Sequence, residues 1–300
     1  MSLENMSLSN EELKTRVFEY IRVLEDKDRD SVSVCAVVET GLLAQREREA
    51  LWGGFKGHPW LQQSQFEALR PLGPWLFQSD IDTLLSKLYP MAESGLHGLL
   101  LTHQPVADEA KKLGQLCVVE DENGEAQLLR YYAPHVMPVL HRRSDMRWHS
   151  RLFGSLGLWW LPGLDGWLEY AGRWNSKEPP VDSDSTITMT PELIQAIGSD
   201  PLTHQILAEL ERSSPSLFEV ACPGLRLAIV DSAVDSARMA GLDDIKDLSV
   251  FAAYCVAYGM EVVRDPGFSN AVDLSVTGPR SLAENLEMIG PLSIREKRHD

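Results

Sequence analysis

The histidines are the first side chains of this sequence that could do chemistry, and their spacing decides what we expect of them. His135, His141 and His149 lie close together in the chain. None of them is paired with another histidine at i, i+4 or flanked by the glutamate of a zincin motif. We therefore expect hydrogen-bonded or solvated histidines and no metal site.

Nucleophile and phosphate motifs are the next candidates for chemistry. The stretch from Gly154 through Ser155 to Gly157 lacks the G-x-S-x-G spacing that places a serine on a sharp turn, so we interpret it as a loop. Neither of the glycine-rich phosphate-binding motifs occurs. Adjacent carboxylates such as Asp243 and Asp244 are explained by helix capping. We therefore expect no catalytic residue, no cofactor and no small-molecule substrate.

Tryptophans are concentrated in one block of the chain. Residues 148–174 hold five of the eight, including Trp159, Trp160 and Trp167. Tryptophan is enriched in protein cores and at binding hot spots. In a strand, the neighbours Trp159 and Trp160 would point to opposite faces of the sheet. We expect at most one of the pair to pack inward, which makes the other a candidate for contact with a partner. If Trp160 is the exposed one, Trp160→Ala should weaken partner binding.

Charge limits the possible partners. The 300 residues carry a formal net charge of −16, and residues 181–290 hold 17 acidic and 6 basic side chains. Such a surface repels phosphate backbones and anionic lipid headgroups. The nearest basic patch, around Arg142 and Arg143, is short. We expect neither nucleic-acid nor membrane binding.

The cellular location can be predicted from three observations. The four cysteines lie far apart, the N-terminal residues lack the apolar core of a signal peptide, and no segment approaches the roughly 20 apolar residues that span a bilayer. These observations predict a cytoplasmic protein whose cysteines are small core residues.

The first half of the chain alternates between strand and helix patterns. Apolar periodicity and turn residues predict helices at 9–25, 80–89 and 106–113, the last ended by Gly114, strands at 31–39, 74–78 and 95–102, and a hairpin at 115–132 that turns at Asn123-Gly124. The second half is helical, with its clearest helix running from Asp244 to Gly259 and a final short helix at 282–289.

The fold class that we predict is α/β in the α+β sense. A mixed sheet with flanking helices occupies residues 1–174, a polar linker follows at 175–190, and a smaller helical lobe occupies 191–300.

Three strings of the first lobe resemble the type VI secretion adaptor chaperones, often called Tap or Tec. They are LRPLGPWLFQ at 69–78, the long run at 98–140 and LFGSLGLWW at 152–160. The resemblance covers about residues 30–172, with Gly73, Pro74, Trp75, Arg130, Tyr131, Tyr132 and Pro134 matching the motifs. Ala133 and His135 depart from them, because the family usually has aspartate and arginine there.

The resemblance implies an adaptor without catalysis or cofactor. Such a protein binds a cognate toxic effector and helps to mount it on the spike protein of the secretion machine. We expect partner contacts from the motif residues Trp75, Arg130, Tyr131 and Tyr132, alongside the tryptophans at 159, 160 and 167. Arg130 could instead serve mainly to stabilise the end of the hairpin.

Two alternatives stay open at the level of the sequence. One is a hydrolase whose site is assembled from distant residues, using His141 or His149 with a carboxylate. The other is a structural subunit of an oligomer, with the tryptophans in a self-interface.

Overall fold

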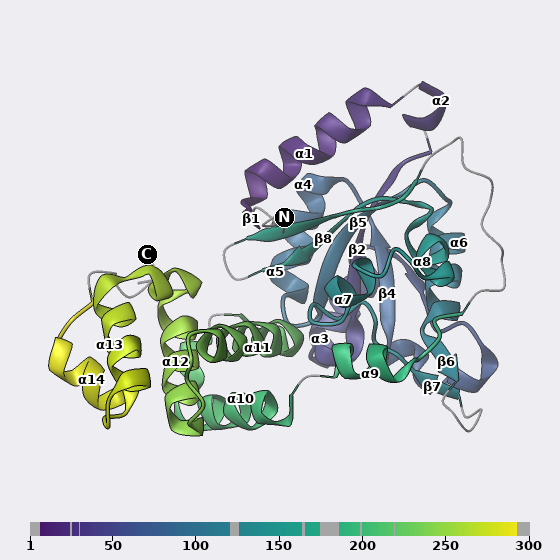
Figure 1. The fold of residues 1–300 in the computed structure, drawn as a ribbon. Helices are drawn as coiled ribbons and strands as arrows, with labels where there is room; N and C mark the ends of the chain where they lie inside the picture. Colours follow the sequence, from purple (N-terminus) through teal and green to yellow (C-terminus); the bar gives the residue numbers. More distant parts are fainter. Residues whose placement is uncertain are drawn as a thin grey trace. The chain divides into compact units, whose positions relative to one another are not determined.

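The chain forms two compact units, Met1–Ile197 and Gly198–Asp300 (Figure 1). The structure is a computed structural model and describes residues 7–24, 26–29, 31–120, 126–163, 166–174, 186–198, 200–218 and 220–292. Most of the predicted linker at 175–190 lies outside the described residues. The division falls after Ile197, so the helix at 191–197 belongs to the first unit, whereas we had expected it in the second.

A seven-stranded sheet is the centre of the first unit. The strands run in the order β1-β9-β8-β5-β2-β4-β3, and every pair among the described residues is antiparallel. Their bounds are β1 Ser7–Leu8, β2 Ser33–Glu39, β3 Lys56–Pro59, β4 Pro74–Gln78, β5 Leu96–Thr102, β8 Leu156–Pro162 and β9 Trp167–Ala171. The predicted α+β class and the strands at 31–39, 74–78 and 95–102 are confirmed, whereas the sheet that we expected to be mixed is antiparallel in its described pairs.

The predicted hairpin is also confirmed, as a separate two-stranded sheet. It pairs β6 (Val118–Glu120) with β7 (Ala126–Leu128), and its turn lies outside the described residues.

Helices cover both faces of the large sheet (Figure 1). One face packs against α1 (Asn10–Val23), α3 (Gln45–Gly54) and the helical run of α4 (Ile81–Thr83), a π turn (Leu84–Leu88) and α5 (Tyr89–Ala92). The other packs against α6 (Val106–Leu116), α7 (Met137–His141), α8 (Arg147–Phe153) and α9 (Pro191–Ile197). The remaining short elements are α2 (Asp26–Arg29) and 3-10 turns at Thr40–Leu42, Ser64–Phe66 and Arg70–Leu72.

Local capping explains where the helices begin. Ser9 and Glu12 form a capping box at the start of α1, and Asp80 accepts a hydrogen bond from the backbone N–H of Thr83 at the start of α4. Such caps satisfy backbone donors that the first helical turn leaves unpaired. The predicted starts of both helices are therefore confirmed.

Gly114 does not end α6, which continues to Leu116. A Cβ on Gly114 would overlap the carbonyl oxygen of Trp60, so the glycine allows the helix to approach the segment after β3 closely. Our interpretation of this glycine as a helix stop was wrong, because its role depends on a contact 54 residues away in the sequence.

The second unit is helical, as predicted. It comprises α10 (Pro201–Ser213), α11 (Pro223–Met239), α12 (Ile245–Tyr258), α13 (Pro266–Thr277) and α14 (Leu282–Ile289), with 3-10 turns at Pro215–Leu217 and Met260–Arg264. Asp244 caps α12, and Gly259 ends it at φ 83°. Phe251 and Phe268 meet edge to face in the core, where Asp247 accepts a hydrogen bond from the N–H of Leu282.

Within the described part of the chain, none of the helices is long and apolar enough to cross a membrane.

Candidate protein-binding site

Two of the three segments that carry the sequence resemblance meet at one end of the large sheet. Glu39, the last residue of β2, lies opposite Pro74, the first residue of β4. Arg130 follows the hairpin and donates from Nε to Oε2 of Glu39 over 3.1 Å. Two motifs that lie more than 50 residues apart in the sequence are thereby joined through one residue, by the backbone of Glu39 on one side and its carboxylate on the other.

A β-bulge directs His97 toward the same carboxylate. The register between β2 and β5 shifts between Val37 and Val38, opposite His97. Gly98 follows with φ 151°, a conformation that favours glycine. His97 is fully buried, and its Nε2 lies 3.1 Å from Oε2 of Glu39.

Electrostatics keep Glu39 charged and His97 neutral near pH 7. Burial alone would raise the pKa of Glu39, but the hydrogen bond from His97 and the charge of Arg130 hold that pKa below its ordinary value. Burial lowers the pKa of His97, and the charge of Glu39 only partly opposes this. His97 is therefore a neutral donor through Nε2, and Arg130 supplies the positive charge.

This cluster predicts that the first unit loses stability in acid. As the pH falls below about 6.5, His97 binds a proton more readily in the unfolded state than in the folded state. Near pH 4.5 the same is true of Glu39. Stability is fully present above these values and falls as pH decreases. We expect Glu39→Gln to remove the share of this pH dependence that arises near pH 4.5, and to lower stability at pH 7 by about 1–3 kcal/mol.

Thermal melts at a series of pH values measure both effects. Glu67→Gln, which changes an exposed carboxylate, is the matched control and should follow the wild-type curve. A Glu39→Gln variant with an unchanged pH slope would contradict this account of the cluster.

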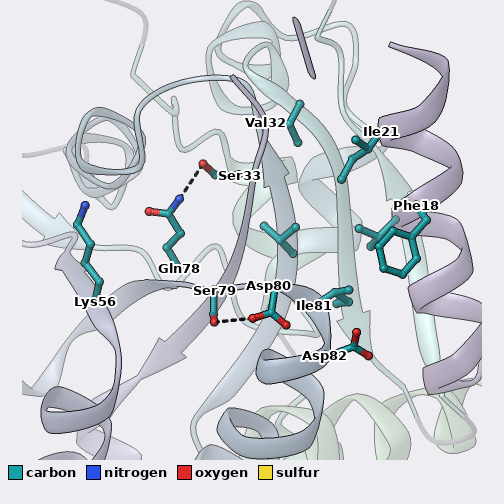
Figure 2. Close-up of a pocket in the computed structure, with 12 residues that line it drawn as sticks. Phe18, Ile21, Val32, Ser33, Lys56, Gln78, Ser79, Asp80, Ile81 and Asp82 are labelled. Carbon is teal, nitrogen blue, oxygen red and sulfur yellow. Dashed lines mark hydrogen bonds between the residues drawn. The ribbon is translucent and has the colours of Figure 1, made fainter. Parts of the chain in front are cut away.

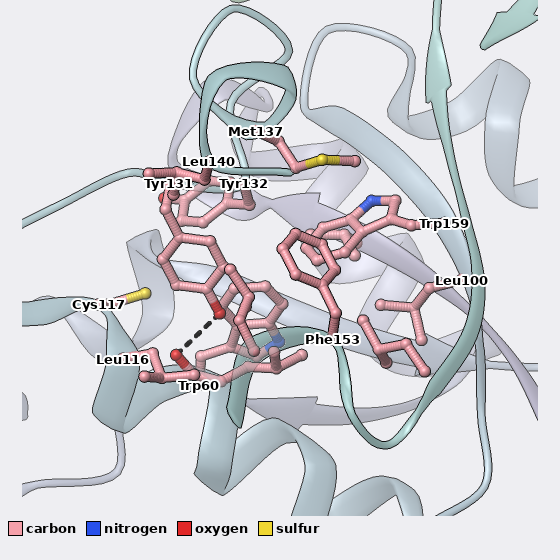
Figure 3. Close-up of a cluster of buried hydrophobic side chains, with 14 of the residues drawn as sticks. Trp60, Leu100, Leu116, Cys117, Tyr131, Tyr132, Met137, Leu140, Phe153 and Trp159 are labelled. Carbon is pink, nitrogen blue, oxygen red and sulfur yellow. Dashed lines mark hydrogen bonds between the residues drawn. The ribbon is translucent and has the colours of Figure 1, made fainter. Parts of the chain in front are cut away.

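Tyr131 and Tyr132 are core residues and not surface contacts (Figure 3). The ring of Tyr131 stacks on Trp60 with centroids 5.7 Å apart, and its hydroxyl donates to the carbonyl oxygen of Leu113 over 3.0 Å. Tyr132 meets Trp60 and His97 edge to face. Their expected role as direct partner contacts is corrected, because these rings fill the space between the sheet and α6. Ala133 is also buried.

Trp75 lies at the same end of the sheet, on the opposite face from Glu39. It is partly exposed, and its indole N–H donates to the carbonyl oxygen of Arg70 over 2.9 Å. Trp52 of α3 packs against it with ring centroids 5.8 Å apart and is 39% exposed. The segment before β4 adds two exposed leucines, Leu69 and Leu72. The indoles of Trp52 and Trp75, which we call the tryptophan pair, are rigid apolar surface of the kind found at binding hot spots.

The other three candidate tryptophans are buried. Trp159 and Trp160 do point to opposite faces of β8, but each is 0% exposed and belongs to the core of its own face. Trp160 donates to Glu169 over 3.0 Å, and Trp167 donates to Asn10 over 2.8 Å. The expectation that one of the adjacent pair is uncovered is wrong, because α1 and its neighbours cover the second face.

The histidines considered for hydrolysis are occupied by backbone contacts. Nε2 of His141 lies 2.8 Å from the carbonyl oxygen of Ala171, and Nε2 of His149 lies 2.9 Å from that of His141. The nearby Asp145 pairs with Arg143. This arrangement does not favour the hydrolase alternative.

Ser155 lies in a buried polar cluster. It donates to Glu109 over 2.7 Å and accepts from Lys112, which also forms an ion pair with Glu109. The hydroxyl of Ser155 is therefore already engaged, as donor to Glu109 and as acceptor from Lys112. Among the described residues, no group of three or more His, Cys, Asp or Glu side chains is placed to hold a metal ion.

One of three comparisons with known proteins finds a match, which is to a family model. Residues 37–150 match a family model described as a domain of unknown function, DUF4123. No curated protein and no solved structure matches the chain. The matched segment contains Glu39, Trp52, Trp75, His97 and Arg130. The candidate site therefore lies within the segment that matches DUF4123.

Sequence reasoning missed Glu39, His97 and Trp52. Glu39 and His97 are polar residues beside or within apolar strand runs, and that interruption is the signal that could have singled them out. Trp52 follows no motif, and only its packing on Trp75 distinguishes it.

Proposed function

We propose that this protein is a non-catalytic adaptor that binds a cognate effector of the type VI secretion system and helps to mount it on the spike protein. The proposal identifies the DUF4123 domain with the adaptor domain that the sequence motifs resemble. It also assigns the protein to the bacterial cytoplasm, where effectors are loaded, and requires no cofactor.

One observation carries this proposal. The matching motif residues around Trp75 and Arg130 lie at the same end of the sheet, on its two faces, and Trp75 forms an accessible aromatic pair with Trp52. Motifs that converge on the ion pair of Glu39 and Arg130 maintain the shape of that end, and the partly exposed tryptophans there supply binding area. This is the construction expected of a surface that grips another protein.

Capture of the full chain from its native cells tests the proposal. A tagged copy is purified from cells that express the secretion machinery, and the proteins bound to it are identified by mass spectrometry. Recovery of an effector together with a spike protein is the expected result. Recovery of neither from such cells would reject the adaptor function.

The tryptophan pair should contribute directly to partner binding. We expect Trp52→Ala to weaken the affinity for the captured partner at least 10-fold, in the range of hot-spot truncations, without a large change in melting temperature. Titration calorimetry with the purified partner measures the affinity. Leu128→Ala is the matched control, since Leu128 is also 39% exposed but lies on the hairpin. Equal affinities for Trp52→Ala and wild type would remove the tryptophan pair from the interface.

A further inference from the structure

An open groove of about 600 Å³ lies at the other end of the same strands, where β2 and β3 begin and β4 ends (Figure 2). Its walls come from α1, the start of β2 and the start of α4. The apolar part of the lining is Val17, Phe18, Ile21, Val32, Val34 and Ile81. Phe18 is 57% exposed, which leaves a large aromatic ring of the groove wall in contact with solvent.

The backbone beneath the groove is already paired. β2 lies between β5 and β4, and β4 lies between β2 and β3, so both are interior strands. Even the side chains at the floor are joined, since Gln78 donates to Ser33 over 3.0 Å. An extended segment lying over β2 and β4 would find no strand edge to pair with, because the free edge on this side of the sheet belongs to β3. An occupant that satisfies its own backbone hydrogen bonds, namely a helix, fits this floor.

The charged rim selects among helices. Asp80 and Asp82 flank the apolar wall at Ile81, and the low pKa of Asp80, caused by the hydrogen bond from the backbone N–H of Thr83, keeps that side chain charged. Lys14 is the cation beside them, at 3.1 Å from Asp82, and it also pairs with Glu11. At this wall the carboxylates outnumber the cation, which complements a basic side chain placed there, whereas Lys56 contributes a positive charge on the β3 side of the groove.

We propose that this groove binds an amphipathic helix of the client protein, with apolar residues three or four positions apart and a lysine or arginine within one turn of them. The inference rests on the proposed adaptor function, because it needs a client. It adds a second docking site, separated from the tryptophan pair by the length of β2 and β4. A groove of this volume accommodates a few apolar side chains from one helix face.

Photo-crosslinking within the full chain tests the inference directly. Phe18 is replaced by p-benzoylphenylalanine, the tagged complex with effector and spike is captured and irradiated, and the cross-linked segment is identified by mass spectrometry. The expected product joins position 18 to a basic amphipathic helix of the effector. The same replacement at Val23, which lies on α1 but outside the groove lining and is 75% exposed, should give at least 10-fold less product.

Affinity measurements with the captured effector distinguish the contribution of the apolar groove wall to binding from that of the charged rim. Phe18→Glu should weaken binding at least 10-fold, and Val23→Glu should stay within 2-fold of wild type. Asp80→Asn retains a good N-cap residue but removes the charge, so it should weaken binding about 3- to 10-fold and reduce its dependence on salt.

The possible failures are distinguishable. If the wild-type chain captures effector and spike but the variant with p-benzoylphenylalanine at position 18 gives no cross-link, the groove is not a docking site and the adaptor function stands. The same conclusion follows if Phe18→Glu binds the effector with full affinity. A cross-link to an acidic segment, to an extended segment or to a second copy of this chain overturns the proposed occupant. Failure of the wild-type chain to capture effector and spike rejects the adaptor function, and the inference falls with it.

Discussion

Replacing Trp160 with alanine should lower the free energy of unfolding of the first unit by about 3–5 kcal/mol, the usual cost of removing a large buried aromatic side chain. The indole projects from β8 into the core on the α1 side of the sheet, where it is fully buried, and its N–H donates a hydrogen bond to Glu169. The variant therefore loses packing and also leaves that carboxylate with one donor fewer. For a unit of this size we expect a fall in melting temperature of roughly 6–20 °C.

Binding should respond differently from stability. Below its melting temperature, Trp160→Ala should retain the affinity of wild type for the client, because the indole is not accessible to a partner. This expectation replaces the one drawn from the sequence, in which Trp160→Ala weakened binding. Trp52→Ala provides the matched comparison, since it should change affinity much more than stability. A Trp160→Ala variant that melts with wild type would show that the indole is not packed as described.

Replacing Gly114 with alanine should also be costly, at about 2–4 kcal/mol, because the new methyl group would overlap the carbonyl oxygen of Trp60. The sign of this effect is informative. In a helix without such a contact, glycine to alanine stabilises by about 1 kcal/mol. Destabilisation therefore measures the close approach of α6 to the segment after β3.

Gly53→Ala is the control for helix propensity. Gly53 lies in α3, and no atom comes within 4 Å of the position that its Cβ would take. We expect this variant to be neutral or slightly more stable than wild type in urea unfolding. If Gly114→Ala behaves like Gly53→Ala, then the contact with Trp60 is looser than the structure indicates.

Much of the fold could be predicted because its signals are local. The capping box at Ser9 and Glu12, the cap at Asp244 and the glycine at Gly259 mark helix ends through contacts within a few residues. The hairpin at 118–128 follows from two apolar runs and a turn between them. These features depend on backbone donors and torsion angles that neighbouring side chains satisfy.

The site could be predicted only in part. Motif resemblance singled out Trp75 and Arg130, and both lie at the end of the sheet that we propose as a binding surface. It also included Tyr131 and Tyr132, because a motif records that residues recur together without recording which face the partner and which hold the shape. Burial alone separates these two classes.

The sequence by itself determined the α+β class, the helical second half, the acidic charge and the positions of several strands and helices. Only the tertiary structure decided that Trp159 and Trp160 are both covered, that Gly114 is a contact glycine and that Glu39 joins His97 to Arg130. It also decided that the side chain of Phe18 remains exposed in the wall of a groove. The physical reason is that helix and strand patterns arise from neighbours in the chain, whereas exposure depends on which distant element comes to lie over a face. An apolar stripe predicts that a surface should be covered, and the packing of the whole unit determines what covers it.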